Sequence, residues 1–195
     1  AYTVGVTTVE WYAGIQPPPV GGVYTVLNAL VLGVLLAFRN KEAYDRWWEA
    51  RKLWGQLVND SRNLALKAAR AFAPGAPERA EVRRLVVGFP LALKDHLRAG
   101  VQLRQVPGFE AEPDDPKHVP AHIAGRVFQL VRDARQAGRL TDFDLLLLDP
   151  HIRAYMDIAG ACERIRNTPL PLSYRALLRH GTVLYLVSTP WLIGK

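Results

Sequence analysis

Hydrophobic and polar positions divide this chain into two apolar ends and a long amphipathic middle. Residues 21–38 carry no charge over eighteen positions, and a helix of that length, rising about 1.5 Å per residue, nearly crosses a hydrocarbon layer about 30 Å thick. We predict a membrane helix there. The alternative is a buried core helix, because Asn28 and two inner glycines dilute the apolar run. Residues 181–194 are also apolar and, although Pro190 interrupts them, they are interpreted as part of another membrane helix.

The segment before residue 21 is interpreted as incomplete. Residues 1–14 are apolar and rich in β-branched side chains, but they are short for a membrane span and include Glu10. We therefore expect the end of a preceding membrane helix. Three prolines at positions 17–19 cannot continue a helix and predict a stiff turn. The chain starts with Ala1 and shows no signal-peptide pattern, so we expect it to begin inside a longer protein.

The middle of the chain has the pattern of helices in water. Basic side chains become frequent after residue 38, which by the positive-inside rule predicts that this end of the membrane helix faces the cytoplasm. Apolar residues recur at helical spacing from 46 to 72 and favour an amphipathic continuation of the same helix. Further helices are predicted over residues 78–97, 119–137 and 142–166. Residues 110–117 are rich in Pro, Asp and Glu, so we expect a polar loop that does not pack.

Composition narrows the possible partners. The formal net charge of +7 and the pI of about 9.8 raise nucleic acid and anionic lipid as candidates. The basic residues are spread along the chain, and no zinc-finger spacing, RNA-binding aromatic signature or Gly-rich phosphate loop accompanies them. We therefore predict no nucleic-acid partner. The single cysteine, Cys162, cannot form an intrachain disulfide and is interpreted as a small buried hydrophobe.

Few residues support catalysis or cofactor binding. Of the five histidines, only His118 and His122 share i, i+4 spacing, and Pro120 between them disrupts a common helix face. Acidic pairs such as Asp142 and Asp144 lie among charged residues and are interpreted as solvated surface. No Ser-His-Asp arrangement can be assembled. We therefore predict no enzyme activity, no metal site and no cofactor.

Two motifs resemble the bestrophin family, particularly its bacterial members. Residues 38–55 read Phe-Arg-Asn-Lys-Glu-Ala-Tyr-Asp-Arg-Trp-Trp-Glu-Ala-Arg-Lys-Leu-Trp-Gly, which is similar to the family's pore-lining helix where it enters an Arg-Trp-Trp segment. Residues 160–174 read Gly-Ala-Cys-Glu-Arg-Ile-Arg-Asn-Thr-Pro-Leu-Pro-Leu-Ser-Tyr, which is similar to the link from the cytoplasmic helices to the next membrane helix. The motifs occur in the family's order, so the resemblance covers nearly the whole chain.

The resemblance implies an all-α protein in which membrane helices continue into a cytoplasmic helical bundle, with a homopentamer around a central pore. A single bestrophin-like unit would occupy residues 1–195. Its parts would be membrane helices over 1–38, the first incomplete, mainly cytoplasmic helices over 39–168, and the start of a third membrane helix over 169–195. The family's fourth membrane helix and its tail, which carries the calcium-binding acidic cluster of animal members, are absent. Calcium regulation is therefore not predicted.

The resemblance also implies two constrictions in the pore. The neck would be lined by Leu30, Val34 and Phe38, which lie at i, i+4 and i+8. An apolar stripe repeated around an axis makes a constriction that gates by dewetting, although the same side chains could instead pack on neighbouring helices or lipid. Counting back from the second motif, the resemblance implies a cytoplasmic aperture at Phe143. A buried core position is the alternative for Phe143.

The first motif contains residues with structural roles. Trp47 and Trp48 either lie at the membrane interface with Arg46 beside them, or fill the core between cytoplasmic helices. We favour a structural role for both indoles in either case. Arg39 and Asn40 complete the motif after the neck.

The second motif is interpreted as the junction that returns the chain to the membrane. Glu163 and Arg164 are expected to hold it through paired charges, because an unpaired buried charge would be costly. Pro169 and Pro171 should end the helix and redirect the chain into the bilayer. Cys162 belongs to the same motif.

The function implied by the resemblance is passive ion flow through a multi-pass protein of the bacterial inner membrane. We favour conduction of anions, chloride among them. A cation-conducting bacterial homologue is an alternative, because an apolar constriction does not fix the sign of the ion. A non-conducting helical scaffold at the membrane is another. The expected partners are further copies of the chain, membrane lipid and permeating small ions.

Overall fold

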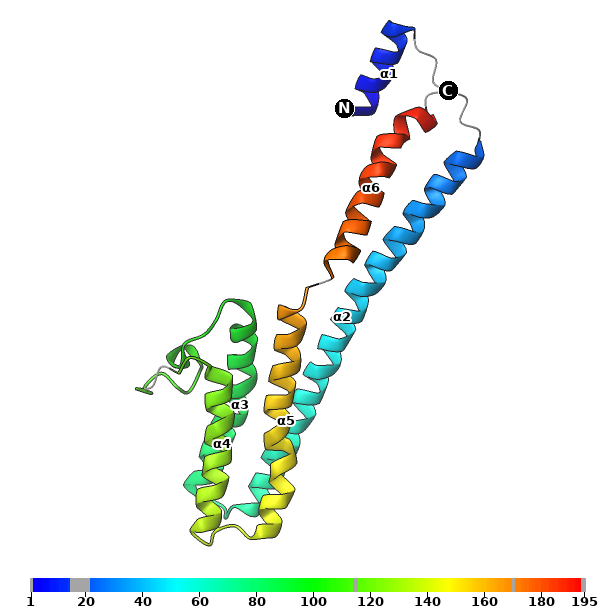
Figure 1. The fold of residues 1–195 in the computed structure, drawn as a ribbon. Coiled ribbons are helices and arrows are strands. Elements are labelled where there is room, and N and C mark those ends of the chain that lie inside the picture. The colour runs from blue at the N-terminus through cyan, green and yellow to red at the C-terminus, as the bar shows by residue number, and fades with distance from the viewer. Residues whose placement is uncertain (1, 15–21, 114–115, 170, 194–195) are drawn as a thin grey trace. The chain divides into compact units, whose positions relative to one another are not determined.

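The computed structural model describes residues 2–14, 22–113, 116–169 and 171–193, and over these ranges the chain forms helices and no strand (Figure 1). The predicted all-α class is therefore confirmed. In order, the elements are α1 (Tyr2–Ala13), α2 (Gly22–Ala71), α3 (Pro77–Arg98), the short 3-10 helix η1 (Leu103–Gln105), α4 (Val119–Gln136), α5 (Asp142–Asn167) and α6 (Leu172–Ile193).

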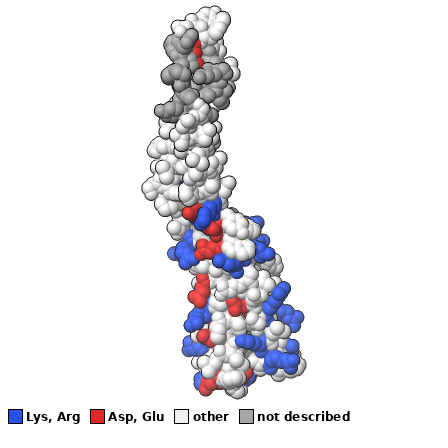
Figure 2. Space-filling model, turned by 90° about the vertical axis from the view of Figure 1, so that its right-hand side faces the viewer, with Lys and Arg blue, Asp and Glu red and all other residues white. Residues whose placement is uncertain are grey.

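The chain divides into two compact units. One contains Ala1–Trp47 and Pro169–Lys195, and the other contains Trp48–Thr168. Helix α2 has 50 residues and contributes to both units. Figure 2 shows that, on the face drawn, Lys, Arg, Asp and Glu side chains gather on the second unit, whereas the first presents mainly uncharged side chains. On this face, the described residues of the two units therefore differ in polarity.

The unit Trp48–Thr168 has an apolar core between α2, α3, α4 and α5. Leu57 and Leu64 on α2 are buried at helical spacing, as the amphipathic pattern predicts. The rings of Phe89 on α3 and Tyr155 on α5 stack at 4.2 Å between centroids. Burial raises the pKa of Tyr155 to about 12, although its hydroxyl donates a hydrogen bond to Ser61 Oγ over 3.0 Å. The three helices predicted within this unit are confirmed, and no helix end is shifted by more than one residue.

Local signals fix the ends of these helices. Thr141 Oγ1 accepts a hydrogen bond from the amide of Asp144 over 3.1 Å, and Asp144 Oδ2 accepts one from the amide of Thr141 over 3.0 Å. This reciprocal cap satisfies two amides that the first turn of α5 would otherwise leave without partners. Gly138, just after α4, has φ of 71°, a conformation that glycine adopts without strain.

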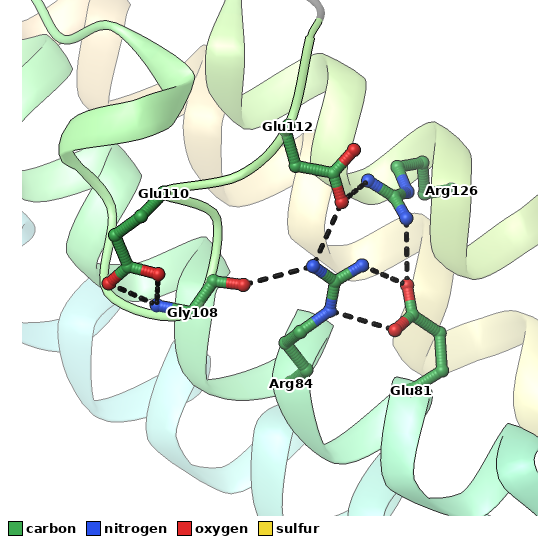
Figure 3. Close-up of polar contacts among 6 residues, drawn as sticks. All are labelled: Glu81, Arg84, Gly108, Glu110, Glu112 and Arg126. Carbon is green, nitrogen blue, oxygen red and sulfur yellow. Dashed lines mark hydrogen bonds and ion pairs between the residues drawn. The ribbon is translucent and has the colours of Figure 1, made fainter.

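The loop after η1 differs from the prediction, because its Glu112 is packed rather than solvated (Figure 3). Glu112 Oε1 lies 2.9 Å from Arg84 Nη1 and 2.7 Å from Arg126 Nη1. The same two guanidinium groups also bind Glu81, and Arg84 donates a further hydrogen bond to the carbonyl of Gly108 over 2.9 Å. Phe109 is fully buried, with Arg84 above its ring at 4.5 Å. The expectation that residues 110–117 do not pack was therefore wrong at Glu112. Its carboxylate forms ion pairs with two arginines that lie on separate helices, α3 and α4.

The other unit is built from α1, the first part of α2 and α6. Asn28 on α2 donates a hydrogen bond to Ser188 Oγ on α6 over 2.8 Å. Gly181 on α6 lies so close to Leu35 that a Cβ placed on it would approach Leu35 Cδ1 to 2.5 Å. Small residues of this kind let two helices approach closely. Within the described ranges, none of the helices has both the length and the apolar character that crossing a membrane requires.

Candidate pore-lining segment and polar clusters

The three predicted neck residues lie on one exposed stripe of α2. Leu30, Val34 and Phe38 are 60%, 45% and 53% exposed in the single chain. Residues four apart in a helix share a face, with a drift of about 40° per step. The stripe is therefore available to contact something outside this chain. Whether it lines a pore stays a prediction.

Apolar exposure in this unit extends beyond the stripe. Leu36 on α2 is 44% exposed, and several residues of α6 are exposed as well. Contiguous apolar surface of this kind is rare on soluble monomers and marks contact with a membrane or with other proteins. The exposed apolar residues of α6 are Leu172, Leu177, Val183, Leu184, Leu186 and Val187.

An open groove between α2 and α6 combines apolar walls with positive charge. It has a volume of about 440 Å³. Three of its lining residues are arginines, namely Arg39 on α2 and Arg175 and Arg179 on α6. Arg39 directly follows Phe38, so positive charge adjoins one end of the neck stripe. Its remaining lining residues are Leu35, Leu36, Leu178, Thr182 and Val183.

Phe143 lies in the first turn of α5 and is 68% exposed. The alternative that Phe143 fills the core of the chain is therefore wrong. Its position follows from the cap at Thr141, because Thr141 and Asp144 together fix where the helix begins. A large apolar side chain that lies outside the core at the start of a helix could contact other copies of the chain around an aperture. The aperture role of Phe143 stays a prediction.

The first motif is mainly exposed along α2. Trp47 and Trp48 are 56% and 46% exposed, so the alternative that both indoles fill the core is wrong for this chain. Trp47 contacts Tyr44, with ring centroids 5.7 Å apart. Arg39 and Asn40 are exposed, and Arg46 is half-buried. The interface role of the two tryptophans remains a prediction.

Both charged residues of the second motif have partners on other elements. Glu163 and Arg164 face different partners. Arg164 Nη2 donates to Glu49 Oε1 on α2 over 2.6 Å, whereas Glu163 accepts from two histidines. Neighbouring helix residues point about 100° apart, which explains why each finds a partner on a different element. The chain leaves α5 after Asn167, and α6 begins at Leu172, so both Pro169 and Pro171 lie in the connection, as predicted.

Cys162 is buried, as expected, and is 6% exposed. Burial raises the pKa of its thiol, and the negative charges of Glu163 and Glu49 raise that pKa further. A thiol with a raised pKa is a weak nucleophile at neutral pH, because the thiolate is the reactive form. This residue is therefore suited to packing.

The histidines form a cluster that the sequence did not indicate. His118 was paired with His122 by spacing, but its Nε2 lies 2.7 Å from Glu163 Oε1. The same carboxylate oxygen is 3.1 Å from His96 Nε2. His96 received no role from the sequence, since it lies 22 positions from His118 and 67 from Glu163. Only the packing of α3, α4 and α5 brings these groups together.

Comparisons with known proteins agree on one family. A family model described as bacterial/fungal bestrophin protein matches residues 1–194. The voltage-dependent anion channel-forming protein sll1024 of Synechocystis is 30% identical over 202 aligned residues, which cover 99% of this chain. The voltage-dependent anion channel-forming protein mll4386 of Mesorhizobium japonicum is 36% identical over 165 residues, which cover 83% of this chain.

Solved structures agree with the fold. Two crystal structures of variants of a bacterial bestrophin homolog from Klebsiella pneumoniae have TM-scores of 0.80 and 0.79, at 22% and 24% identity. They cover 97% and 99% of this chain, which corresponds to 73% and 74% of those chains. The chain spans 65% of the length of the Synechocystis protein and 52% of the Mesorhizobium protein.

Proposed function

Because the chain belongs to the bacterial and fungal bestrophin family, we propose that it is a pore-forming part of a channel that conducts anions passively, chloride among them. Members of this family are membrane proteins, and the predicted membrane location is therefore confirmed. The observation that carries the proposal is the exposed apolar stripe of Leu30, Val34 and Phe38. The proposal assigns the chain to channels rather than enzymes. The names of two relatives, both voltage-dependent anion channel-forming proteins, support this proposal.

The proposed assembly is a homopentamer in the bacterial inner membrane. One bestrophin-like unit would include membrane segments over residues 1–38 and 169–195 and a cytoplasmic part over 39–168. The apolar exposure of α2 and α6 supports this assignment, since these surfaces require lipid or neighbouring copies as partners. The unit Trp48–Thr168 carries many charged side chains on the face drawn in Figure 2, as expected for a surface in contact with water. Membrane lipid and permeating ions are the remaining proposed partners.

The proposed gate acts through water. Several copies of the stripe around an axis would form a narrow apolar bore. Such side chains offer an ion no replacement for its hydration shell, so a narrow bore expels water and blocks the ion. Widening the bore lets water and ions enter. The proposed second constriction, at Phe143, would act in the same way on the cytoplasmic side.

Positive charge in the unit that contains the stripe supports conduction of anions rather than cations. Arg39, Arg175 and Arg179 line one groove in the unit that contains the stripe, and arginines near a pore raise the local concentration of anions. A cation-conducting homologue is the alternative. Reversal potentials measured across a chloride gradient and across a sodium gradient distinguish the two.

The experiment is a planar-bilayer recording of the full-length parent protein and its variants. Changing Leu30, Val34 and Phe38 together to Ala should produce a constitutive leak with the oligomer intact. The control is the double change Leu32→Ala and Leu36→Ala, because these positions lie about 200° around the helix from Leu30 and Val34. It should not leak. A leak in the control and none in the triple variant would refute the neck assignment, and vesicles without any flux would favour a non-conducting scaffold.

A further inference from the structure

Three metal-binding side chains converge where α3, α4 and α5 meet. His96 lies in the last turn of α3, His118 is the residue that caps α4, and Glu163 lies near the end of α5. Their donor atoms, Nε2, Nε2 and a carboxylate oxygen, all lie within 4.8 Å of one another. The two imidazole rings are 4.5 Å apart between centroids. Three separate elements therefore present donors to one point.

We infer that His96, His118 and Glu163 form a binding site for a divalent transition metal such as zinc. Imidazole nitrogen and carboxylate oxygen are common zinc ligands, and three protein ligands leave one position for water. Metal–ligand bonds of 2.0–2.1 Å in tetrahedral geometry separate the donors by about 3.3 Å. The present separations from Glu163 Oε1 are 2.7 Å and 3.1 Å. The two imidazole nitrogens therefore need to move away from this carboxylate oxygen by only a few tenths of an ångström.

The three side chains are accessible as well as held in place. His96, His118 and Glu163 retain 21%, 36% and 29% of their side-chain exposure. An ion from solvent can therefore reach the donors without unfolding the helices that hold them.

The hydrogen bond that caps α4 opposes metal binding, but it is the weaker effect. His118 Nδ1 accepts from the amide of Ala121 over 3.0 Å, so the proton of the neutral ring lies on Nε2. A metal on Nε2 requires the proton to move to Nδ1, and the cap is lost. Losing a cap weakens binding by about fivefold, whereas structural zinc sites bind with association constants above about 10⁷ M⁻¹. Metal binding should therefore free the Ala121 amide.

The other polar histidine cluster lacks this capacity. His151 Nδ1 lies 2.8 Å from Asp60 Oδ1, and His151 Nε2 lies 2.7 Å from Lys67 Nζ. Because the lysine amine occupies the second ring nitrogen and carries a positive charge when protonated, it repels a cation. Geometry and charge thus favour the site at Glu163 over the site at Asp60.

The experiment measures metal binding directly and does not depend on conduction. The full-length protein in detergent is stripped with a chelator and titrated with zinc chloride by calorimetry, and with cobalt chloride by visible absorption. We expect saturation at one zinc ion per chain and an intense tetrahedral cobalt spectrum. Hydrogen exchange at Ala121 should accelerate when zinc is bound.

Variants assign the binding to these residues. Glu163→Gln, His96→Gln and His118→Asn should each weaken zinc binding at least about tenfold. His118→Asn is informative because asparagine still caps the helix, so the metal-free protein should remain folded. The control His180→Gln, at an exposed position on α6, should bind as the parent does. The inference is overturned if the parent shows no saturable binding or no tetrahedral cobalt band, or if the three variants bind zinc like the parent.

Discussion

Asn28 and Ser188 lie 160 positions apart in the sequence and are joined by a hydrogen bond of 2.8 Å from Asn28 Nδ2 to Ser188 Oγ. The serine hydroxyl in turn donates to the carbonyl of Tyr185 over 3.0 Å, so its oxygen is left to accept from Asn28. Most residues that flank Asn28 and Ser188 in the sequence are apolar. The pair therefore joins α2 to α6 and satisfies a polar group that an apolar environment would penalise.

The change Ser188→Ala should destabilise the protein by about 1 kcal/mol, because the Asn28 amide loses its acceptor. Adding Asn28→Leu should restore most of that stability, since no polar group is then left without a partner. Thermal unfolding in detergent measures both effects. Thr182→Val is the control, because the Thr182 hydroxyl donates within its own helix, to the carbonyl of Leu178. Additive losses in the double variant would show that the two residues are not coupled.

Gly88→Ala should cost about 1–3 kcal/mol of stability, because the added methyl group overpacks a full core. A Cβ at this position would lie 2.5 Å from Cε2 of the buried Phe109 ring. The control is Gly125→Ala on α4, where nothing lies within 4 Å. It should stabilise the helix by up to about 1 kcal/mol. Equal melting temperatures for the two variants would contradict the close contact between Gly88 and Phe109.

Phe143→Ala should change conductance or ion-size selection while leaving the melting temperature nearly unchanged. The side chain is 68% exposed, and substitutions at exposed positions rarely exceed about 0.5 kcal/mol, whereas a buried phenylalanine would cost about 3–5 kcal/mol. The matched control is Phe128→Ala on α4, where the phenylalanine is 48% exposed. It should alter neither currents nor stability. Unchanged currents in Phe143→Ala would refute the assignment of Phe143 to a cytoplasmic aperture.

Glu112 should make stability depend on pH in acid. Hydrogen bonds from Arg126 and Arg84 lower the pKa of Glu112 in the folded chain. Because its pKa is lower in the folded chain, ionised Glu112 stabilises the fold at pH values above the unfolded pKa, about 4.3. This stabilisation is lost as the pH falls through the folded pKa. Glu112→Gln should therefore lower stability at neutral pH and reduce its loss in acid.

Urea unfolding of the parent and of Glu112→Gln between pH 7 and pH 3, a range of about four units around the carboxyl pKa, measures this difference. The gap between the two proteins should narrow as the pH falls. Asp133→Asn, at an exposed position on α4, is the control and should follow the parent. A gap that stays constant over the whole range would show that the ion pairs of Glu112 do not set the acid response.

The sequence by itself determined the helices, the polarity of their surfaces and the family. Apolar residues at helical spacing predicted α3, α4 and α5 closely, because a helix places residues three and four apart on the same face. The capping signal at Thr141 and Asp144 is equally local. The two motifs, containing Arg-Trp-Trp and Cys-Glu-Arg-Ile, identified the family without any contact being known.

Tertiary structure alone decided which polar groups meet. The Glu112 loop was expected to remain solvated, but Arg84 and Arg126 bind it. The partners of Glu163 were not predicted, and its carboxylate lies within hydrogen-bond distance of His96 and His118. Local patterns fix a residue's face on its own helix, but its partners across the core depend on how helices pack, and packing is set by many side chains at once. For this reason charge and spacing predicted the elements of this protein but not its polar clusters.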